Sequence, residues 1–244
     1  MSISASFSSP GLFLTVALTA YLAFVSPWLG RRQYDRLASR RAHDPRALTR
    51  AYRLWIAEEW IWVAVLALIL VLSPGIDLAD VGLAKPDNLG RVAPMIAGMS
   101  GALVIGTVLL RHLARTGRAV PGQAAVAELM PRTSGERWHA LAMAVTAGVC
   151  EEIVYRGLLI AFGVGVLGLG TAAAAALALV VFVAGHLYQG WKGLVVVALL
   201  GFWLTTVYLS TGSLLLPIMA HILIDVRGLV CMPAPTRKTV GHAA

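Results

Sequence analysis

The stretch GVCEEIVYRGLLIAF, residues 148–162, places three charged side chains inside a run that is otherwise apolar. A charge near the centre of a lipid bilayer costs about 2.5–3.5 kcal/mol on insertion scales. Glu151, Glu152 and Arg156 therefore need either partners or a function at that depth. The stretch predicts a membrane helix that carries a polar site.

The composition of the whole chain agrees with a membrane location. Of its 244 residues, 58% are hydrophobic and 13% are charged, and the mean hydropathy is +0.77. A soluble domain carries about a quarter charged residues. We expect an all-α, polytopic membrane helix bundle that forms one integral membrane domain over residues 1–244.

Seven apolar segments are long enough to be membrane helices, and the alternating short strands of a membrane barrel are absent. The predicted spans are residues 11–30, 55–73, 93–111, 139–164, 169–188, 193–210 and 213–230.

The positive charges orient this predicted bundle. Residues 31–53 hold eight arginines, whereas residues 74–92 hold only Lys85 and Arg91 as basic residues. Cytoplasmic loops are enriched in Lys and Arg, so we expect the N-terminus outside and the C-terminus in the cytoplasm. The expected membrane is a bacterial plasma membrane. Residues 1–30 lack the basic start of a cleavable signal, so the first span is expected to be retained. The further basic residues on the cytoplasmic side are Arg111, Arg115, Arg118, Arg132, Arg137, Lys192, Arg227, Arg237 and Lys238.

The net charge of +8 does not indicate nucleic-acid binding, because the basic residues stand at the ends of apolar runs without interleaved aromatic residues. The expected partners are the lipid bilayer and a membrane-associated substrate.

Ionisable residues inside the spans come from three helices and are types that perform acid–base or metal chemistry. Glu152 and Arg156 are four residues apart and can pair on one helix face. Glu151 has no neutralising neighbour in the sequence, which makes it the stronger candidate for chemistry. The full set is Glu151, Glu152, Arg156, His186, His221 and Asp225.

Two histidines and a carboxylate also form a catalytic zinc set, so the residues leave a zinc-dependent mechanism open, with Glu151, His186 and His221 as candidate ligands. Cys150 and Cys231 show no metal-ligand spacing, and Cys150 is interpreted as a small apolar packing residue. The sequence indicates no cofactor apart from this zinc ion, whose presence it leaves open.

Three further patterns lie outside this set. Residues 133–136, Thr-Ser-Gly-Glu, predict a capping box that opens the fourth helix. Glu58 and Glu59 lie among Trp55, Trp60 and Trp62, and this pattern is typical of an interfacial anchor. Ser100, within GMSG of the third span, fits the GxSG pattern of rhomboid serine proteases, but small residues at this spacing are common in membrane helices.

Three segments resemble motifs of the CPBP family, the CAAX-processing and bacteriocin-processing intramembrane proteases, also called the Abi family. EEIVYR (residues 151–156) is similar to the EExxxR motif, FVAGH (residues 182–186) to FxxxH, and HILID (residues 221–225) to HxxxN or HxxxD. The resemblance covers residues 128–230, which form the predicted catalytic core.

The resemblance implies roles for these residues. Glu151 would be the general base that activates water, and His186 would help to hold that water. His221 and the residue four positions later would stabilise the oxyanion, but here that residue is Asp225, where the CAAX-processing branch has asparagine. An ionised aspartate would repel an oxyanion, so Asp225 is either protonated, an orienting partner of His221, or a metal ligand. Glu152 and Arg156 would support the site.

The sequence therefore predicts an intramembrane endopeptidase, a hydrolase that cleaves a membrane-associated protein or peptide. The alternatives are a rhomboid-like serine protease, a non-enzymatic immunity or binding protein on the same scaffold, and a proton-coupled transporter, against which the lack of inverted-repeat signs counts.

Overall fold

The computed structural model describes residues 3–86, 89–116, 118 and 123–232. Over these residues the regular structure is helical, apart from one isolated bridge between Ser6 and Gly75. The all-α fold class is therefore confirmed for the described part of the chain. Arg237, Lys238 and the C-terminus lie outside it, so their cytoplasmic placement stays a prediction.

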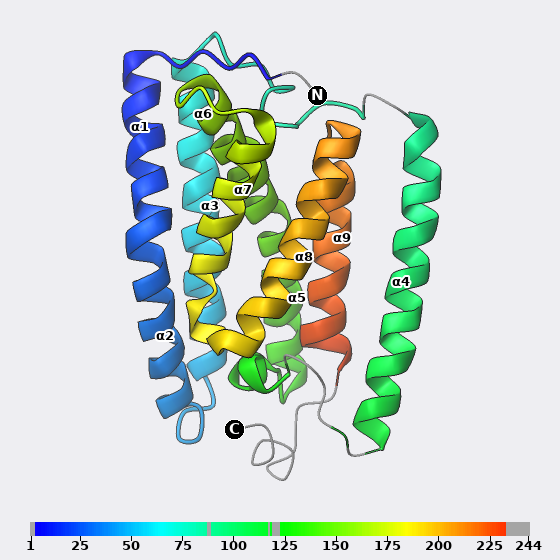
Figure 1. Ribbon diagram of the computed structural model, residues 1–244. Coiled ribbons are helices and arrows are strands. Elements are labelled where there is room, and N and C mark those ends of the chain that lie inside the picture. The colour runs from blue at the N-terminus through cyan, green and yellow to red at the C-terminus, as the bar shows by residue number, and fades with distance from the viewer. Residues whose placement is uncertain (1–2, 87–88, 117, 119–122, 233–244) are drawn as a thin grey trace.

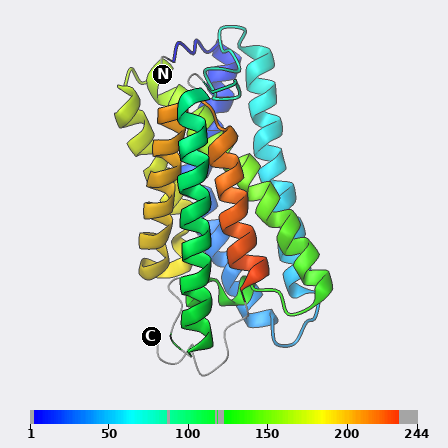
Figure 2. The ribbon, with the colours of Figure 1, turned by 90° about the vertical axis from the view of Figure 1, so that its right-hand side faces the viewer.

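The helices form one elongated bundle whose members run approximately along a common direction, with α4 at its edge (Figures 1 and 2). The α-helices are α1 (Ser9–Ala20), α2 (Ser26–Arg40), α3 (Ala47–Leu72), α4 (Leu89–Arg115), α5 (Ser134–Glu151), α6 (Leu159–Gly165), α7 (Thr171–Gly185), α8 (Gly190–Thr211) and α9 (Leu215–Asp225). The π-helical segments η1 (Tyr21–Val25), η3 (Glu152–Leu158) and η5 (Val226–Cys231) continue α1, α5 and α9, while η2 (Ala124–Leu129) and η4 (Leu187–Gln189) are 3₁₀ turns.

Four helical runs of the described chain are long and apolar enough to cross a membrane. They are Ser9–Arg40, Ala47–Leu72, Val92–Arg115 and Leu187–Thr211. Helical structure also occupies the other three predicted segments, but length and composition do not establish them as membrane spans. Seven crossings therefore remain a prediction.

The α5–η3–α6 run lies inside the bundle because its central side chains are almost completely apolar and buried. Cys150, Val154, Leu158 and Ile160 have no exposed surface. The neighbouring helices α3, α7 and α9 pack around this run (Figure 1). Charged residues of this run are consequently held away from bulk water.

The N-cap half of the predicted capping box is confirmed at the start of α5, where the Thr133 hydroxyl accepts a hydrogen bond of 3.2 Å from the Glu136 backbone N–H. The structure gives the Glu136 carboxylate the backbone N–H of Arg132 as its partner, in place of the Thr133 N–H of a complete capping box. The Glu136 carboxylate also accepts hydrogen bonds of 2.5 and 2.9 Å from the Arg41 guanidinium, and one of 2.6 Å from the Arg132 backbone N–H. Burial raises the pKa of Glu136, but these donors outweigh burial and lower the pKa below its ordinary value. The ion pair fixes the end of α2 to the start of α5.

A close contact between α5 and α9 depends on Gly148. A Cβ atom at this position would lie 2.8 Å from the backbone nitrogen of Ile222 and 2.4 Å from its side chain. A larger residue would therefore push α9 away. Since His221 precedes Ile222, this glycine allows the histidine to approach the end of α5.

Candidate active site

The EEIVYR motif lies at the point where α5 changes into the π-helix η3. Glu151 is the last residue of α5, and Glu152 is the first of η3. Single π-helical turns inside α-helices occur frequently at functional sites. The predicted pair is present: Arg156 Nη1 lies 2.9 Å from Glu152 Oε1, with side-chain exposures of 2% and 0%.

Arg156 is held by three different groups. Besides Glu152, its guanidinium donates a hydrogen bond of 3.4 Å to the Gly201 carbonyl on α8. It also lies over the Phe182 ring of α7, with the guanidinium carbon 4.1 Å from the ring centroid. Arg156 thus connects η3 to α7 and α8, and its buried charge is fully committed to the protein.

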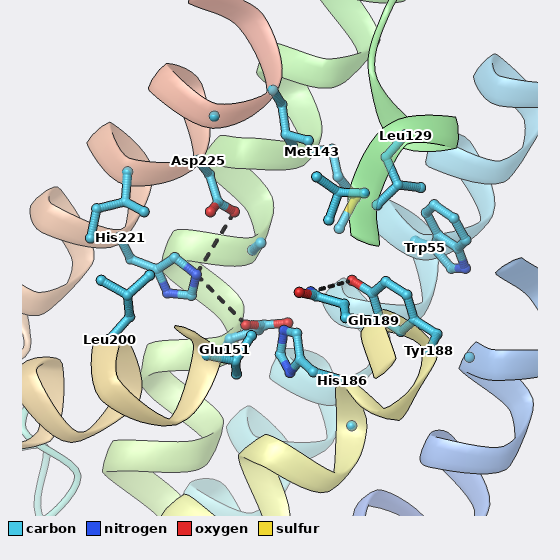
Figure 3. Close-up of a pocket in the computed structure, with 18 of the residues that line it drawn as sticks. Trp55, Leu129, Met143, Glu151, His186, Tyr188, Gln189, Leu200, His221 and Asp225 are labelled. Carbon is cyan, nitrogen blue, oxygen red and sulfur yellow. Dashed lines mark hydrogen bonds and ion pairs between the residues drawn. The ribbon is translucent and has the colours of Figure 1, made fainter. Parts of the chain in front are cut away.

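His221 links α9 to both glutamates of the motif. Its Nδ1 lies 2.7 Å from Glu152 Oε1, and a carboxylate paired with Arg156 accepts this hydrogen bond, so Nδ1 carries the proton. The other nitrogen, Nε2, lies 3.8 Å from a carboxylate oxygen of Glu151 and 3.8 Å from one of Asp225 (Figure 3). The structure therefore groups three of the predicted residues, Glu151, Glu152 and Asp225, around the imidazole of His221.

His186 is held at the end of α7, where it is the C-cap residue. Its Nδ1 lies 2.8 Å from the Phe182 carbonyl oxygen, which can only accept, so Nδ1 is again the protonated nitrogen. In the neutral ring this leaves Nε2 as a hydrogen-bond acceptor. The rings of Phe182 and Tyr188 lie close to the imidazole, with centroids 4.7 and 6.0 Å away.

A cavity of about 340 Å³ brings these groups together. Glu151, His186, His221 and Asp225 all border it (Figure 3). A volume of this size is within the range of ligand-binding pockets. The remaining wall is mainly apolar and aromatic and includes Trp55, Leu129, Met143, Tyr188 and Leu200.

The cavity lies in the half of the bundle where α2 ends, α3 begins and the α7–α8 turn is found (Figure 1). The arginine-rich segment of residues 31–53 belongs to the same half. The polar site is therefore closer to the basic end of the bundle than to the opposite end.

The interpretation of Glu58 and Glu59 as a surface anchor was wrong. Both residues border the cavity. Glu59 is only 5% exposed, and its Oε2 has no hydrogen-bond partner among the described residues, whereas Glu58 accepts a hydrogen bond of 2.5 Å from the Tyr21 hydroxyl. The neighbouring Trp60 faces outward and is 48% exposed. Its exposure fits an interfacial anchor, whereas the positions of the adjacent glutamates do not.

Glu59 faces the α5 helix close to Glu151. Trp62 follows Glu59 by three residues, Tyr155 follows Glu151 by four, and the two rings are in edge contact with centroids 6.4 Å apart. Both carboxyl groups border the same cavity. The site therefore contains a carboxyl group that the motifs did not include.

Other side chains considered from the sequence lie apart from this cavity. Ser100 is exposed on α4, and the structure does not place it on the cavity wall. Cys150 is fully buried, as expected for a packing residue, whereas Cys231 is exposed.

A zinc site is not formed by the side chains as they stand. Among the described residues, no group of three or more His, Cys, Asp and Glu side chains has an arrangement that could hold a metal ion. We therefore derive no step through a metal.

The fold and the site together define a class: a helix bundle with an apolar exterior and a buried cluster of glutamates, histidines and an arginine around a cavity. Residues 133–227 match the family model described as type II CAAX prenyl endopeptidase Rce1-like. No curated protein and no solved structure matched the chain. The family match confirms the resemblance to the CPBP/CAAX proteases, and it includes all six predicted site residues. It implies a protease, and with the apolar helices it indicates an integral membrane protein.

Proposed function

We propose that this protein is an intramembrane endopeptidase that hydrolyses a peptide bond in a membrane-associated protein or peptide by means of a glutamate-activated water. One observation carries this proposal: Glu151, His186 and His221 come from three helical segments and border the same cavity. In each histidine Nδ1 is hydrogen-bonded within the protein, which leaves Nε2 available to contact water or substrate.

The spacing around Glu151 suits a water molecule. The 3.8 Å between its carboxylate and His221 Nε2 is too long for a direct hydrogen bond, and polar groups at such a distance are commonly bridged by water. The free Nε2 of His186 is an acceptor that can orient the same water. In the proposed reaction Glu151 takes a proton from the water while the oxygen attacks the scissile carbonyl, and the proton then passes to the leaving nitrogen.

His221 is the proposed oxyanion-stabilising group. The Nδ1–H of His221 donates to Glu152. A second proton on Nε2 would lie between the carboxylates of Glu151 and Asp225 before the reaction. During the reaction this N–H would donate to the developing oxyanion instead. Asp225 is then an orienting partner of His221 and not itself the group that binds the oxyanion. Glu152 and Arg156 hold His221 in place through the buried ion pair.

The substrate is expected to reach the site from the basic, cytoplasmic end of the bundle. The apolar part of the cavity wall suits a lipid-modified or membrane-inserted segment, and the matching family is described as a CAAX prenyl endopeptidase. In such proteins the lipid is attached to a cysteine close to the C-terminus.

The proposal is tested by Glu151→Gln, which keeps the shape but removes the base. Comparative membrane proteomics of cells with the variant and with the natural protein should reveal an uncleaved precursor in the variant, and the purified variant should be about 10²–10⁴-fold slower on it. Ser100→Ala is the matched control for the rhomboid alternative and should remain active. An active Glu151→Gln protein together with an inactive Ser100→Ala protein would overturn the proposal.

A further inference from the structure

Arg227 is a cation at the cavity for which the proposed mechanism has no use. It lies on η5, two residues beyond Asp225, and it borders the cavity. Its side chain is half-buried, and its Nε is buried without a hydrogen-bond partner among the described residues. No described carboxylate lies within salt-bridge distance of it, although Asp225 is close in sequence.

The surroundings of Arg227 hold it beside α4. A Cβ atom at Gly106 would lie 2.9 Å from Nη1 of Arg227, so the absence of a side chain at Gly106 leaves room for the guanidinium. The buried Nε of this cation has lost its hydration without a hydrogen bond in return, which is unfavourable. The position therefore favours an anionic ligand that enters the cavity.

We propose that Arg227 binds the C-terminal carboxylate of the peptide substrate, an inference that rests on the proposed function. A guanidinium matches a carboxylate in charge and in its two parallel hydrogen bonds. Membrane lipids also carry anions, but their headgroups lie outside the bundle, whereas Arg227 borders the interior cavity that contains Glu151.

The distance from the reacting groups determines where the substrate would be cut. His221 and Arg227 are six residues apart on one helical run, which corresponds to about 9 Å along the axis. An extended chain of three residues spans about 10 Å. A carboxylate held by Arg227 thus places the scissile bond about three residues before the end of the peptide, which matches the three residues that follow the cysteine in a CAAX sequence.

The test compares two probes: a farnesylated peptide that ends in a CAAX sequence with a free carboxylate, and the same peptide with a C-terminal amide. The full-length protein is assayed in phosphatidylcholine vesicles. The natural protein should prefer the acid over the amide by roughly 10–100-fold in kcat/KM, since a hydrogen bond to a charged group is lost with the amide. Arg227→Gln should reduce the ratio of the acid rate to the amide rate to about one, whereas Arg227→Lys should keep part of the preference.

Arg132→Gln is the matched control, because Arg132 is half-exposed and paired with Glu128, and it should keep the full preference. A natural protein that cleaves acid and amide equally, or an Arg227→Gln protein that still discriminates between them, overturns the inference. Addition of phosphatidylglycerol to the vesicles tests whether the anion bound by Arg227 is a lipid headgroup. If Arg227→Gln abolishes only a change in cleavage rate caused by this lipid, and the preference for the acid persists, Arg227 binds headgroups and the inference is wrong.

Binding of both peptides to Glu151→Gln separates this inference from the proposed function. Tighter binding of the acid, lost on adding Arg227→Gln, supports the role of Arg227 even if the natural protein cleaves neither peptide, in which case only the proposed function fails. Cleavage by the natural protein without discrimination refutes only the role of Arg227. If neither peptide is bound or cleaved, both proposals fail.

Discussion

Replacement of Arg156 by alanine should destabilise the protein strongly as well as inactivate it. The substitution leaves the Glu152 carboxylate, which has no exposed surface, without its ion-pair partner. Removal of one member of a buried pair costs about 3–5 kcal/mol, because a charge stays buried without compensation. The contact with the Phe182 ring at 4.1 Å is lost at the same time and adds about 1–2 kcal/mol if it is largely desolvated.

Thermal unfolding of the purified protein in detergent measures this effect. For a chain of about this size, 1 kcal/mol corresponds to about 2–4 °C, so the ion-pair loss alone predicts a decrease in Tm of about 6–20 °C. The double variant Glu152→Gln with Arg156→Met removes both charges and should recover part of this loss, because no unpaired charge remains.

Three results would refute this reasoning. A Tm of Arg156→Ala within the error of the natural protein would mean that the pair does not stabilise the fold. Loss of activity at unchanged Tm would move Arg156 from support of His221 to direct contact with the substrate. A double variant less stable than Arg156→Ala would show that the hydrogen bond from His221 to Glu152, and not the charge balance, dominates.

Three other expectations concern different parts of the molecule. The pKa of Glu136 is lowered in the folded protein, so its ion pair with Arg41 stabilises the fold at pH values above the ordinary glutamate pKa of 4.5. This stabilisation is lost as the pH falls through the pKa of the folded protein. The difference in Tm between the natural protein and Glu136→Gln should therefore shrink on acidification, and a constant difference would contradict this expectation. Glu59→Gln should raise the Tm, because an amide is cheaper to bury than a carboxylate whose Oε2 has no hydrogen-bond partner among the described residues; a lower Tm would show that the carboxyl group has a stabilising partner. Reporter fusions after Arg53 should indicate the cytoplasm and those near Asp80 the outside, and a cytoplasmic signal near Asp80 would reject the proposed orientation.

Much of the helical architecture could be predicted because the apolar runs are long and separated by charged or turn-forming residues. The start of α5 could also be predicted, since the N-cap at Thr133 belongs to a local sequence pattern. The number of membrane crossings could not be fixed in the same way. The helix Thr171–Gly185 is apolar but short, and whether such a helix spans a membrane depends on its neighbours and not on its own composition.

The site was only partly predictable. The pair of Glu152 and Arg156 follows from their spacing on one helix, but the contact of His221 with Glu152 depends on the approach of α9 at Gly148, which no local pattern encodes. Glu59 was missed because the tryptophans around it dominated the interpretation. A signal was present, since Tyr52, Glu59, Trp62, Leu66 and Ile69 recur at helical spacing and are all buried on α3.

The π-helical turn at Glu152–Leu158 has a consequence for the natural variation of this chain. A π-helix pairs residues five apart, where an α-helix pairs residues four apart, so this segment accommodates an additional residue per turn. Deletion of one residue inside this turn would restore α-helical pairing and leave the helices on either side close to their present orientation. A deletion in the regular part of α5 would instead turn the residues after it by about 100° relative to those before it. Related chains should therefore tolerate a change of one residue in length within this turn better than in the preceding part of α5.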